Sequence, residues 1–243
     1  MLKILVGLSG PSNGDSYVLG KTPKQDGDSL SEVGYLAQEI PLYKNLNAKD
    51  HLAMGAHLNQ RWDSAFIRKR LNDLEIPLDR AINKLSGGQR AQVALALALA
   101  KKPKLLLLDE PVAALDPLAR RDFLSSLAQA VADGGLTVVM SSHLLADLER
   151  VSDHVIVLAS GKTQLCDSID AVLKQHKLLV GPRQKFAEDG FTVIHETQTA
   201  RQSTLLVRAQ KGAKVPLHWL QHEPNIEEII LAYMGQAKGG DKR

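Results

Sequence analysis

Cysteine and aromatic residues are both scarce in this sequence. The 243 residues include one cysteine, Cys166, with four phenylalanines, four tyrosines and two tryptophans. A single cysteine excludes an internal disulfide framework and favours a reducing compartment. So few aromatic rings argue against a large stacking platform of the kind that binds single-stranded nucleic acid.

Long apolar runs and a strong net charge are also missing. The longest apolar run covers residues 93–100, whereas a helix that crosses a membrane needs about twenty apolar residues. The 30 basic and 27 acidic side chains leave a net charge of +3, which argues against a nucleic-acid partner. We therefore expect a globular, cytoplasmic protein without a membrane span of its own.

Short apolar segments alternate with helical patterns over the first 165 residues. Between residues 50 and 85, apolar residues recur three and four positions apart, which is typical of helices. Buried strands that alternate with helices predict an α/β fold with a parallel sheet. Further helices are expected at 86–100 and 118–132, and strands at 17–19, 33–36, 105–108, 137–140 and 155–158.

The pattern changes after about residue 166. Strands are expected at 177–180, 191–195 and 204–207, and a helix from Pro224 to Met234 with Gly235 as its stop. We expect a small α+β accessory region over 166–235 and a disordered tail over 236–243.

The string Leu85-Ser86-Gly87-Gly88-Gln89 is the most specific feature of the sequence. Two glycines let backbone N–H groups approach an anion closely, and the helix that follows presents its positive end to a phosphate. A Ser-Gly-Gly turn by itself is more often only the entry to a helix.

Two acids, Asp109 and Glu110, follow the leucine strand 105–108. The carboxyl ends of parallel strands are where open α/β sheets bind ligands. Asp109 is placed to hold Mg²⁺, and Glu110 to polarise an attacking water. His143 follows the next strand and could contact a terminal phosphate, although lone histidines are more often structural. The alternative for the acids is a solvated pair at a strand end.

Together these motifs resemble the nucleotide-binding domain of an ABC transporter. The resemblance implies a P-loop NTPase-like (RecA-like) parallel sheet over residues 1–165, with an inserted helical subdomain at about 42–88, and ATP and Mg²⁺ as cofactors. The matching segments are the signature Leu85–Gln89, the Walker B strand Leu105–Glu110, the D-loop Pro111–Pro117 with Asp116, the switch histidine His143 and the Q-loop Gly34–Gln38.

The resemblance also implies a role for each site residue. Glu110, His143 and Gln38 would be catalytic, and Asp109 and Gln38 would hold Mg²⁺. Asp116 would belong to the contact between two subunits. Ser86, Gly87, Gly88 and Gln89 would bind the nucleotide of a second ATP-binding subunit in a head-to-tail dimer.

The family's P-loop, Gly-x-x-x-x-Gly-Lys-Ser/Thr, is not found in the 243 residues. Segment 14–22 has five residues between its glycines instead of four, and segment 10–16 puts Asp15 near the position of the phosphate-binding lysine. The best alignment makes Leu2–Leu8 the helix after the P-loop, so we expect the chain to start after that motif and to lack one central strand. The gene sequence ahead of the codon for Met1 tests this expectation.

Three functional hypotheses follow. The first is the ATPase motor of a transporter that powers export through a separate membrane permease, from the inner face of the cell membrane. Export rests on residues 226–235, which resemble the accessory region of drug and lipid exporter (ABC-2 type) subunits. The second is a partner that supplies only its signature to another subunit's ATP site. The third is a soluble family member in DNA repair or translation, which the single signature and low charge disfavour.

Overall fold

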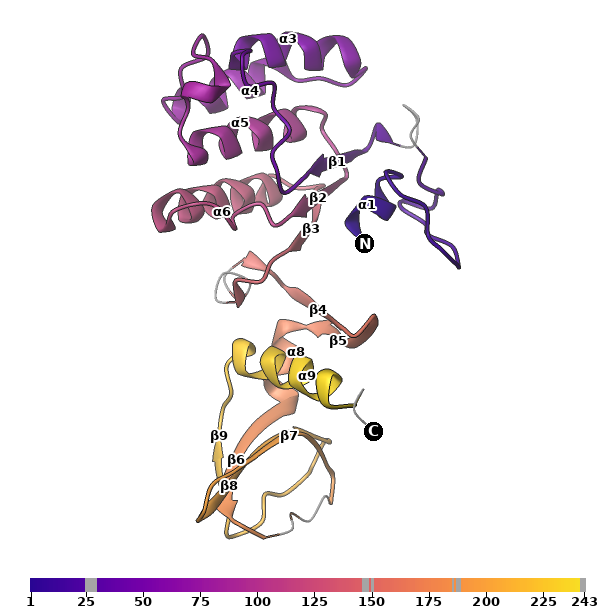
Figure 1. Ribbon diagram of the computed structural model, residues 1–243, viewed down its shortest axis with the longest axis vertical. Helices are drawn as coiled ribbons and strands as arrows, with labels where there is room; N and C mark the ends of the chain where they lie inside the picture. The colour runs from indigo at the N-terminus through magenta and orange to yellow at the C-terminus, as the bar shows by residue number, and fades with distance from the viewer. Residues whose placement is uncertain (25–29, 146–148, 150, 185, 187–188, 241–243) are drawn as a thin grey trace. The chain divides into compact units, whose positions relative to one another are not determined.

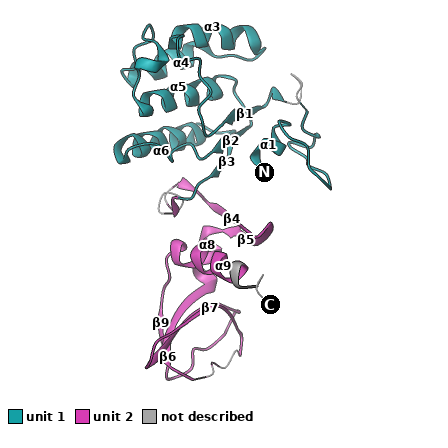
Figure 2. Cartoon of the chain, in the orientation of Figure 1, with its two compact units in different colours: residues 1–143 teal, residues 144–243 magenta. Residues whose placement is uncertain are grey.

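The chain forms two compact units, residues 1–143 and 144–243 (Figure 2). The computed structural model describes residues 1–24, 30–145, 149, 151–184, 186 and 189–240. The boundary expected from the motifs, at about residue 165, lies later in the chain, and that division stays a proposal. Among the described residues, no helix is long and apolar enough to cross a membrane.

A three-stranded parallel sheet organises the first unit (Figure 1). Its order is β1-β2-β3, with β1 at Val33–Leu36, β2 at Leu105–Asp109 and β3 at Thr137–Ser141. The central strand is buried on both faces, and Leu106, Leu107 and Leu108 have no exposed surface. Burial on both faces explains why this strand is a continuous apolar run. The predicted α/β fold with a parallel sheet is confirmed.

Helices cover both faces of this sheet. On one face, the position of a Cβ at Gly34 would lie against Leu106 and the Ala98 carbonyl oxygen of α5 (Gly87–Ala100). On the other face, Leu2 and Val6, in and just after α1 (Leu2–Leu5), pack with Val33 and Leu107. Successive residues of a strand point to opposite faces, so Leu106 and Leu107 contact different layers.

The region between β1 and β2 is helical, as the periodicity predicts. It contains α3 (Ala48–Leu58), α4 (Ser64–Asp73) and a short 3₁₀ helix at Ile82–Lys84, which pack with α5 through a shared apolar cluster. Asn47 and Asp50 form a capping box at the start of α3, which satisfies backbone donors that a helix leaves unpaired. Helix α6 (Pro117–Ala132) follows β2.

The predicted strand at 17–19 is wrong. Val18 and Lys21 form an isolated bridge around a two-residue turn, in which Leu19 and Gly20 have φ of 51° and 78°. Two successive positive φ angles reverse the chain at once, so the apolar residues around Leu19 cannot continue as a strand. Helix α1 ends at Leu5, before the Leu8 expected from the alignment.

The predicted parallel strand at 155–158 is also wrong in its pairing. Strand β4 (His154–Ala159) pairs antiparallel with β5 (Lys162–Ser168) in a two-stranded sheet. Val155 and Val157 are buried while Ile156 and Leu158 are exposed. The apolar run thus hides an alternation of inward and outward residues, which is typical of a half-buried hairpin strand.

The rest of the second unit contains a four-stranded antiparallel sheet, and helices α8 and α9 flank it in the sequence. The sheet order is β7-β8-β6-β9, and β6, β7 and β8 confirm the three strands expected from the sequence. Helix α9 runs through Gly235 to Gly240, so residues 236–240 are helical and not a disordered tail; residues 241–243 lie outside the described residues. The elements are β6 (His176–Pro182), β7 (Phe191–Gln198), β8 (Gln202–Ala209), β9 (Leu220–His222), α8 (Ile169–Gln175) and α9 (Ile226–Gly240).

Candidate functional site

The carboxyl ends of β2 and β3 lie side by side. The two strands are parallel, and their register pairs Leu108 with Met140 and Asp109 with Ser141. Glu110 follows Asp109 directly, and His143 follows Ser141 by two positions. The register therefore brings two acids and a histidine, all predicted from the sequence, to one edge of the sheet.

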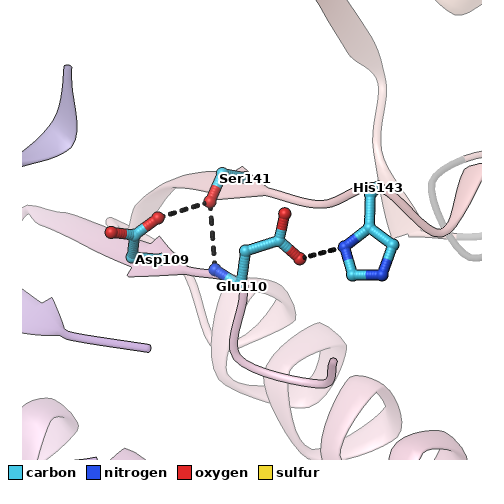
Figure 3. A network of polar contacts seen from close by, with 4 residues as sticks. All are labelled: Asp109, Glu110, Ser141 and His143. Carbon is cyan, nitrogen blue, oxygen red and sulfur yellow. Dashed lines mark hydrogen bonds and ion pairs between the residues drawn. The ribbon is translucent and has the colours of Figure 1, made fainter. Parts of the chain in front are cut away.

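One hydroxyl links the ends of these strands (Figure 3). The Ser141 hydroxyl donates a hydrogen bond to Asp109 Oδ1 over 2.9 Å, and the same oxygen accepts one from the backbone N–H of Glu110 over 3.0 Å. Sequence reasoning did not assign this role to Ser141. The signal that could have found it is a hydroxyl residue opposite an acid where two parallel strands end.

Glu110 leaves the strand in an unusual backbone conformation. Its φ is 50°, in the left-handed region, which costs a residue with a side chain roughly 1–3 kcal/mol. The turn directs its carboxylate toward His143, and Glu110 Oε2 lies 2.8 Å from His143 Nδ1 (Figure 3). The Glu110 side chain is 22% exposed and that of His143 is 64% exposed. This pair thus joins a shielded carboxylate to an accessible imidazole.

The contact between Glu110 and His143 determines which of their atoms donate and which accept. An ionised carboxylate can only accept, so His143 donates from Nδ1, and its Nε2 lies on the opposite side of the ring from Glu110. Glu110 has a second carboxylate oxygen that can accept from a water molecule. The carboxylate can therefore hold a water molecule, and the imidazolium form of the ring, in which both nitrogens donate, can contact an anion through Nε2.

Asp109 is suited to a divalent cation. Oδ1 accepts from the Ser141 hydroxyl and Tyr35 lies close to the same carboxylate, but its two oxygens have about four lone pairs, so the group can still face an ion. Within the described residues, no group of three or more His, Cys, Asp or Glu side chains is arranged to hold a metal. Mg²⁺ does not need such a cage, since one or two carboxylates, water and substrate phosphates usually suffice. The residues present fit Mg²⁺ that is bound together with a phosphate substrate.

Two other side chains belong to this edge. Tyr35 of β1 is paired in register with Leu107, and burial, followed by the negative charge of Asp109, raises the pKa of its hydroxyl. Gln38 lies in an exposed turn after β1, whose Leu36 is paired with Leu108. Gln38 is therefore at the predicted edge, although none of the hydrogen bonds among the described residues joins it to Asp109 or Glu110.

The signature string caps the start of α5. Ser86 Oγ accepts from the Gln89 N–H over 3.1 Å, and Gln89 Oε1 accepts from the Ser86 N–H over 3.0 Å. This capping box fixes the first turn of a 14-residue helix. The N-terminus of such a helix attracts anions because its backbone N–H groups and dipole point outward. Two of the four predicted signature residues thus have a structural role in addition to the predicted one.

The two signature glycines differ in their surroundings. A Cβ at Gly88 would lie 2.7 Å from the Cβ of Ala119 in α6, whereas a Cβ at Gly87 would have no atom nearer than 3.9 Å. Asp116 caps α6, and its Oδ1 accepts from the N–H groups of Leu118 and Ala119 over 3.1 and 3.0 Å. Ala119 therefore joins the signature helix to the predicted D-loop aspartate, and Gly88 is needed for this close packing.

The two segments that could be mistaken for a P-loop do not have its architecture. A P-loop connects a strand to a helix. Segment 10–16 follows helix α1, and segment 14–22 contains the bridge between Val18 and Lys21. Neither segment joins a strand to a helix in the part of the chain that the structure describes.

Comparisons with known proteins identify similar chains. The family model described as ABC transporter matches residues 1–113. A thiamine import ATP-binding protein, ThiQ, of Vibrio parahaemolyticus is 32% identical over 182 residues, which are 72% of this chain and 77% of that protein. A probable sulfate/thiosulfate import ATP-binding protein, CysA, of Chlorella vulgaris is 35% identical over 168 residues, covering 67% and 71% of the two chains.

Two further matches extend this picture. A molybdenum import ATP-binding protein, ModC, of Aromatoleum aromaticum is 32% identical over 234 residues, which are 90% of this chain and 59% of that protein. A solved structure described as the ATP binding subunit of an ABC transporter superposes with a TM-score of 0.62 at 25% identity, covering 72% of this chain and 75% of that one. The three named proteins are import proteins, so the expected export direction and exporter group have no support.

Proposed function

Because this chain belongs to the ATP-binding proteins of ABC transporters, a family of ATPases, we propose that it is the ATP-hydrolysing motor subunit of such a transporter. The observation that carries the proposal is the Glu110–His143 contact of 2.8 Å beside Asp109 at one sheet edge. The proposed partners are a membrane permease and a second ATP-binding subunit, with the chain bound peripherally at the inner face of the membrane.

The residues at the sheet edge would act on the terminal phosphate of ATP. Glu110 would hold the attacking water and accept its proton, and His143, as an imidazolium with a second N–H at Nε2, would donate to a phosphoryl oxygen. Asp109 and Gln38 would hold Mg²⁺, which neutralises phosphate charge when it is bound. The buried hydroxyl of Tyr35 lies close enough to Asp109 for the negative charge of that carboxylate to contribute to its raised pKa.

The signature would serve the ATP of the second subunit. Ser86, Gly87, Gly88 and Gln89 lie at the N-terminus of α5, where the N–H groups of Gly87 and Gly88, which the capping box does not use, would stabilise charge on a γ-phosphate. Asp116 caps α6 beside that turn, so movement of the D-loop and of the signature would be coupled through Ala119. Closure of the two subunits on ATP and their opening after hydrolysis would drive the permease.

A direct test uses the transporter assembly isolated from its own membranes through a tag on this subunit. Glu110→Gln removes the proton acceptor. Gly87→Asp puts a carboxylate where a phosphate would bind, at a position where a Cβ makes only ordinary contacts, with Leu115 at 3.9 Å and Arg90 at 4.0 Å. We expect each to lower the ATPase rate by at least about 100-fold, because both touch transition-state charge. Ser125→Ala, at an exposed position of α6, is the matched control and should leave the rate unchanged.

The second candidate is a subunit that supplies only its signature. It is favoured by the signature turn, in which Ser86 and Gln89 form a complete capping box within this chain. On that hypothesis Gly87→Asp stops ATP hydrolysis by the assembly while Glu110→Gln has no effect. If neither substitution changes the rate, both candidates are wrong.

A further inference from the structure

We propose that Ser141 is a positioning residue, whose single hydroxyl sets the orientation of the Asp109 carboxylate and the backbone of Glu110. Its relevance to ATP hydrolysis rests on the proposed function, but the geometry stands on its own. Ser141 is the last residue of β3, is half-buried and lies directly across from Asp109 in the register.

The direction of both hydrogen bonds is determined by the chemistry of the partners. A carboxylate can only accept and a backbone N–H can only donate. The Ser141 O–H therefore points to Asp109 Oδ1, and a lone pair of the same oxygen points to the Glu110 N–H. Because the hydroxyl both donates and accepts, its loss would remove one contact from each acid at once.

The hydrogen bond from the Glu110 N–H to the Ser141 hydroxyl takes the place of a backbone hydrogen bond between the two strands. Pairing between β2 and β3 ends at Asp109 and Ser141, so the next N–H along β2 has left the ladder. That N–H belongs to Glu110, whose φ of 50° turns the chain out of the strand. The Ser141 side chain supplies the acceptor at this point, and so holds the turn that directs the Glu110 carboxylate to His143.

The contact with Asp109 orients its carboxylate. The anchor at Oδ1 is a neutral hydroxyl, so it restricts rotation of the carboxylate without placing a positive charge beside it. A lysine or arginine in the place of Ser141 would anchor the oxygen but cancel the charge that a cation needs. Groups that orient metal ligands in this way commonly change metal affinity or activity by about 10–100-fold when removed.

The first experiment needs no nucleotide and uses the full chain. Ser141→Ala removes the hydroxyl, Ser141→Thr keeps it on a β-branched side chain suited to a strand, and Ser125→Ala is the control. We expect hydrogen exchange of the Glu110 amide, followed by NMR, to accelerate at least about tenfold in Ser141→Ala only, because its acceptor is lost. Thermal unfolding of each variant confirms that it folds. An unchanged Glu110 amide in Ser141→Ala overturns the proposal.

The second experiment measures catalysis in the native transporter assembly. We expect Ser141→Ala to lower kcat by about 10–100-fold and to raise the Mg²⁺ concentration for half-maximal activity several-fold, with KM for ATP nearly unchanged. Ser141→Thr should restore both quantities. A merely structural role predicts lower thermal stability with normal kcat and Mg²⁺ dependence per folded molecule, and that outcome overturns the proposal.

The two experiments also separate this proposal from the proposed function. If the assembly hydrolyses no ATP, or does so without Glu110, the proposed function fails while the amide measurement still decides whether Ser141 positions Glu110. If Glu110 is required but Ser141→Ala behaves like the wild type in both experiments, only the role of Ser141 is wrong.

Discussion

At the scale of single residues, the two signature glycines are distinguished by what lies next to them. A Cβ on Gly88 would meet the Cβ of Ala119 at 2.7 Å, and an alanine on a packed helix cannot move aside by rotation. We expect Gly88→Ala to lower the free energy of unfolding of the first unit by about 1–3 kcal/mol, the usual cost of overpacking. Gly87→Ala should leave it unchanged or slightly raised, since alanine suits a helix better.

This difference can be measured with the tryptophans, because each unit contains one. In a Trp219→Phe background, the fluorescence of Trp62 reports urea unfolding of the first unit alone. Trp62 packs against the apolar cluster of the helical region, so it senses the core that α5 shares. Equal losses in Gly87→Ala and Gly88→Ala would show that the contact with Ala119 does not matter.

The residues of the sheet edge differ in how far they are predictable. Asp109, Glu110 and His143 follow apolar strands, so a parallel sheet must bring them to one edge, and the sequence is sufficient for that. Ser141 was not predictable as a link, because its role depends on the register of two strands and on the rotation of one hydroxyl. The left-handed conformation of Glu110 leaves no mark in the residue type either.

At the scale of secondary structure elements, the turn between β4 and β5 decides where β4 pairs. Ser160 and Gly161 have φ of 48° and 70°, and two such residues in succession favour a tight antiparallel hairpin. The sequence predicts a strand at 155–158 but not its partner, because four apolar residues in a row fit a parallel core as well as a hairpin. The turn residues Ser160 and Gly161 determine that this strand pairs with β5.

The turn at Ser160 and Gly161 predicts that substitutions at its two positions change the stability of the second unit in opposite directions. We expect Gly161→Ala to destabilise the second unit by about 1 kcal/mol, since a side chain disfavours positive φ. Ser160→Asn should stabilise it by a few tenths of a kcal/mol to about 1 kcal/mol, because asparagine tolerates this conformation well. Urea unfolding followed by Trp219 fluorescence in a Trp62→Phe background measures both. Changes of the same sign would contradict the assignment of the turn.

At the scale of the whole molecule, the comparisons establish the protein family but do not support the expected direction of transport, which was export. The motifs predict an ABC ATP-binding subunit, and the relatives establish that family. Export was inferred from residues 226–235, but Ile226, Ile229, Ile230 and Tyr233 are buried in the core of the second unit. An amphipathic helix that covers a core requires this pattern whatever the protein transports, so the pattern carries no information about direction.

The second unit should also respond to acid, because it contains a buried histidine whose pKa is lowered. His176 is 1% exposed, its Nδ1–H donates to the Val172 carbonyl oxygen over 2.7 Å, and its Nε2 accepts from the Tyr233 hydroxyl over 2.9 Å. Burial, with a smaller contribution from Arg208, lowers the pKa of His176 below its ordinary 6.5. The folded state thus holds the neutral ring that joins α8 and β6 to α9.

The sign of the pH dependence follows from this shift. Between pH 6.5 and the lower pKa of the folded state, the unfolded chain binds a proton at His176 that the folded chain does not. The second unit should therefore lose stability as the pH falls below about 6.5, by up to about 1.4 kcal/mol per pH unit from this residue.

Urea unfolding reported by Trp219, in a Trp62→Phe background, should show this slope between pH 7 and 5. His176→Gln should remove its share of the slope, whereas His222→Gln, at an exposed position of β9, should keep it. A slope that survives His176→Gln unchanged would mean that another group couples the second unit to acid.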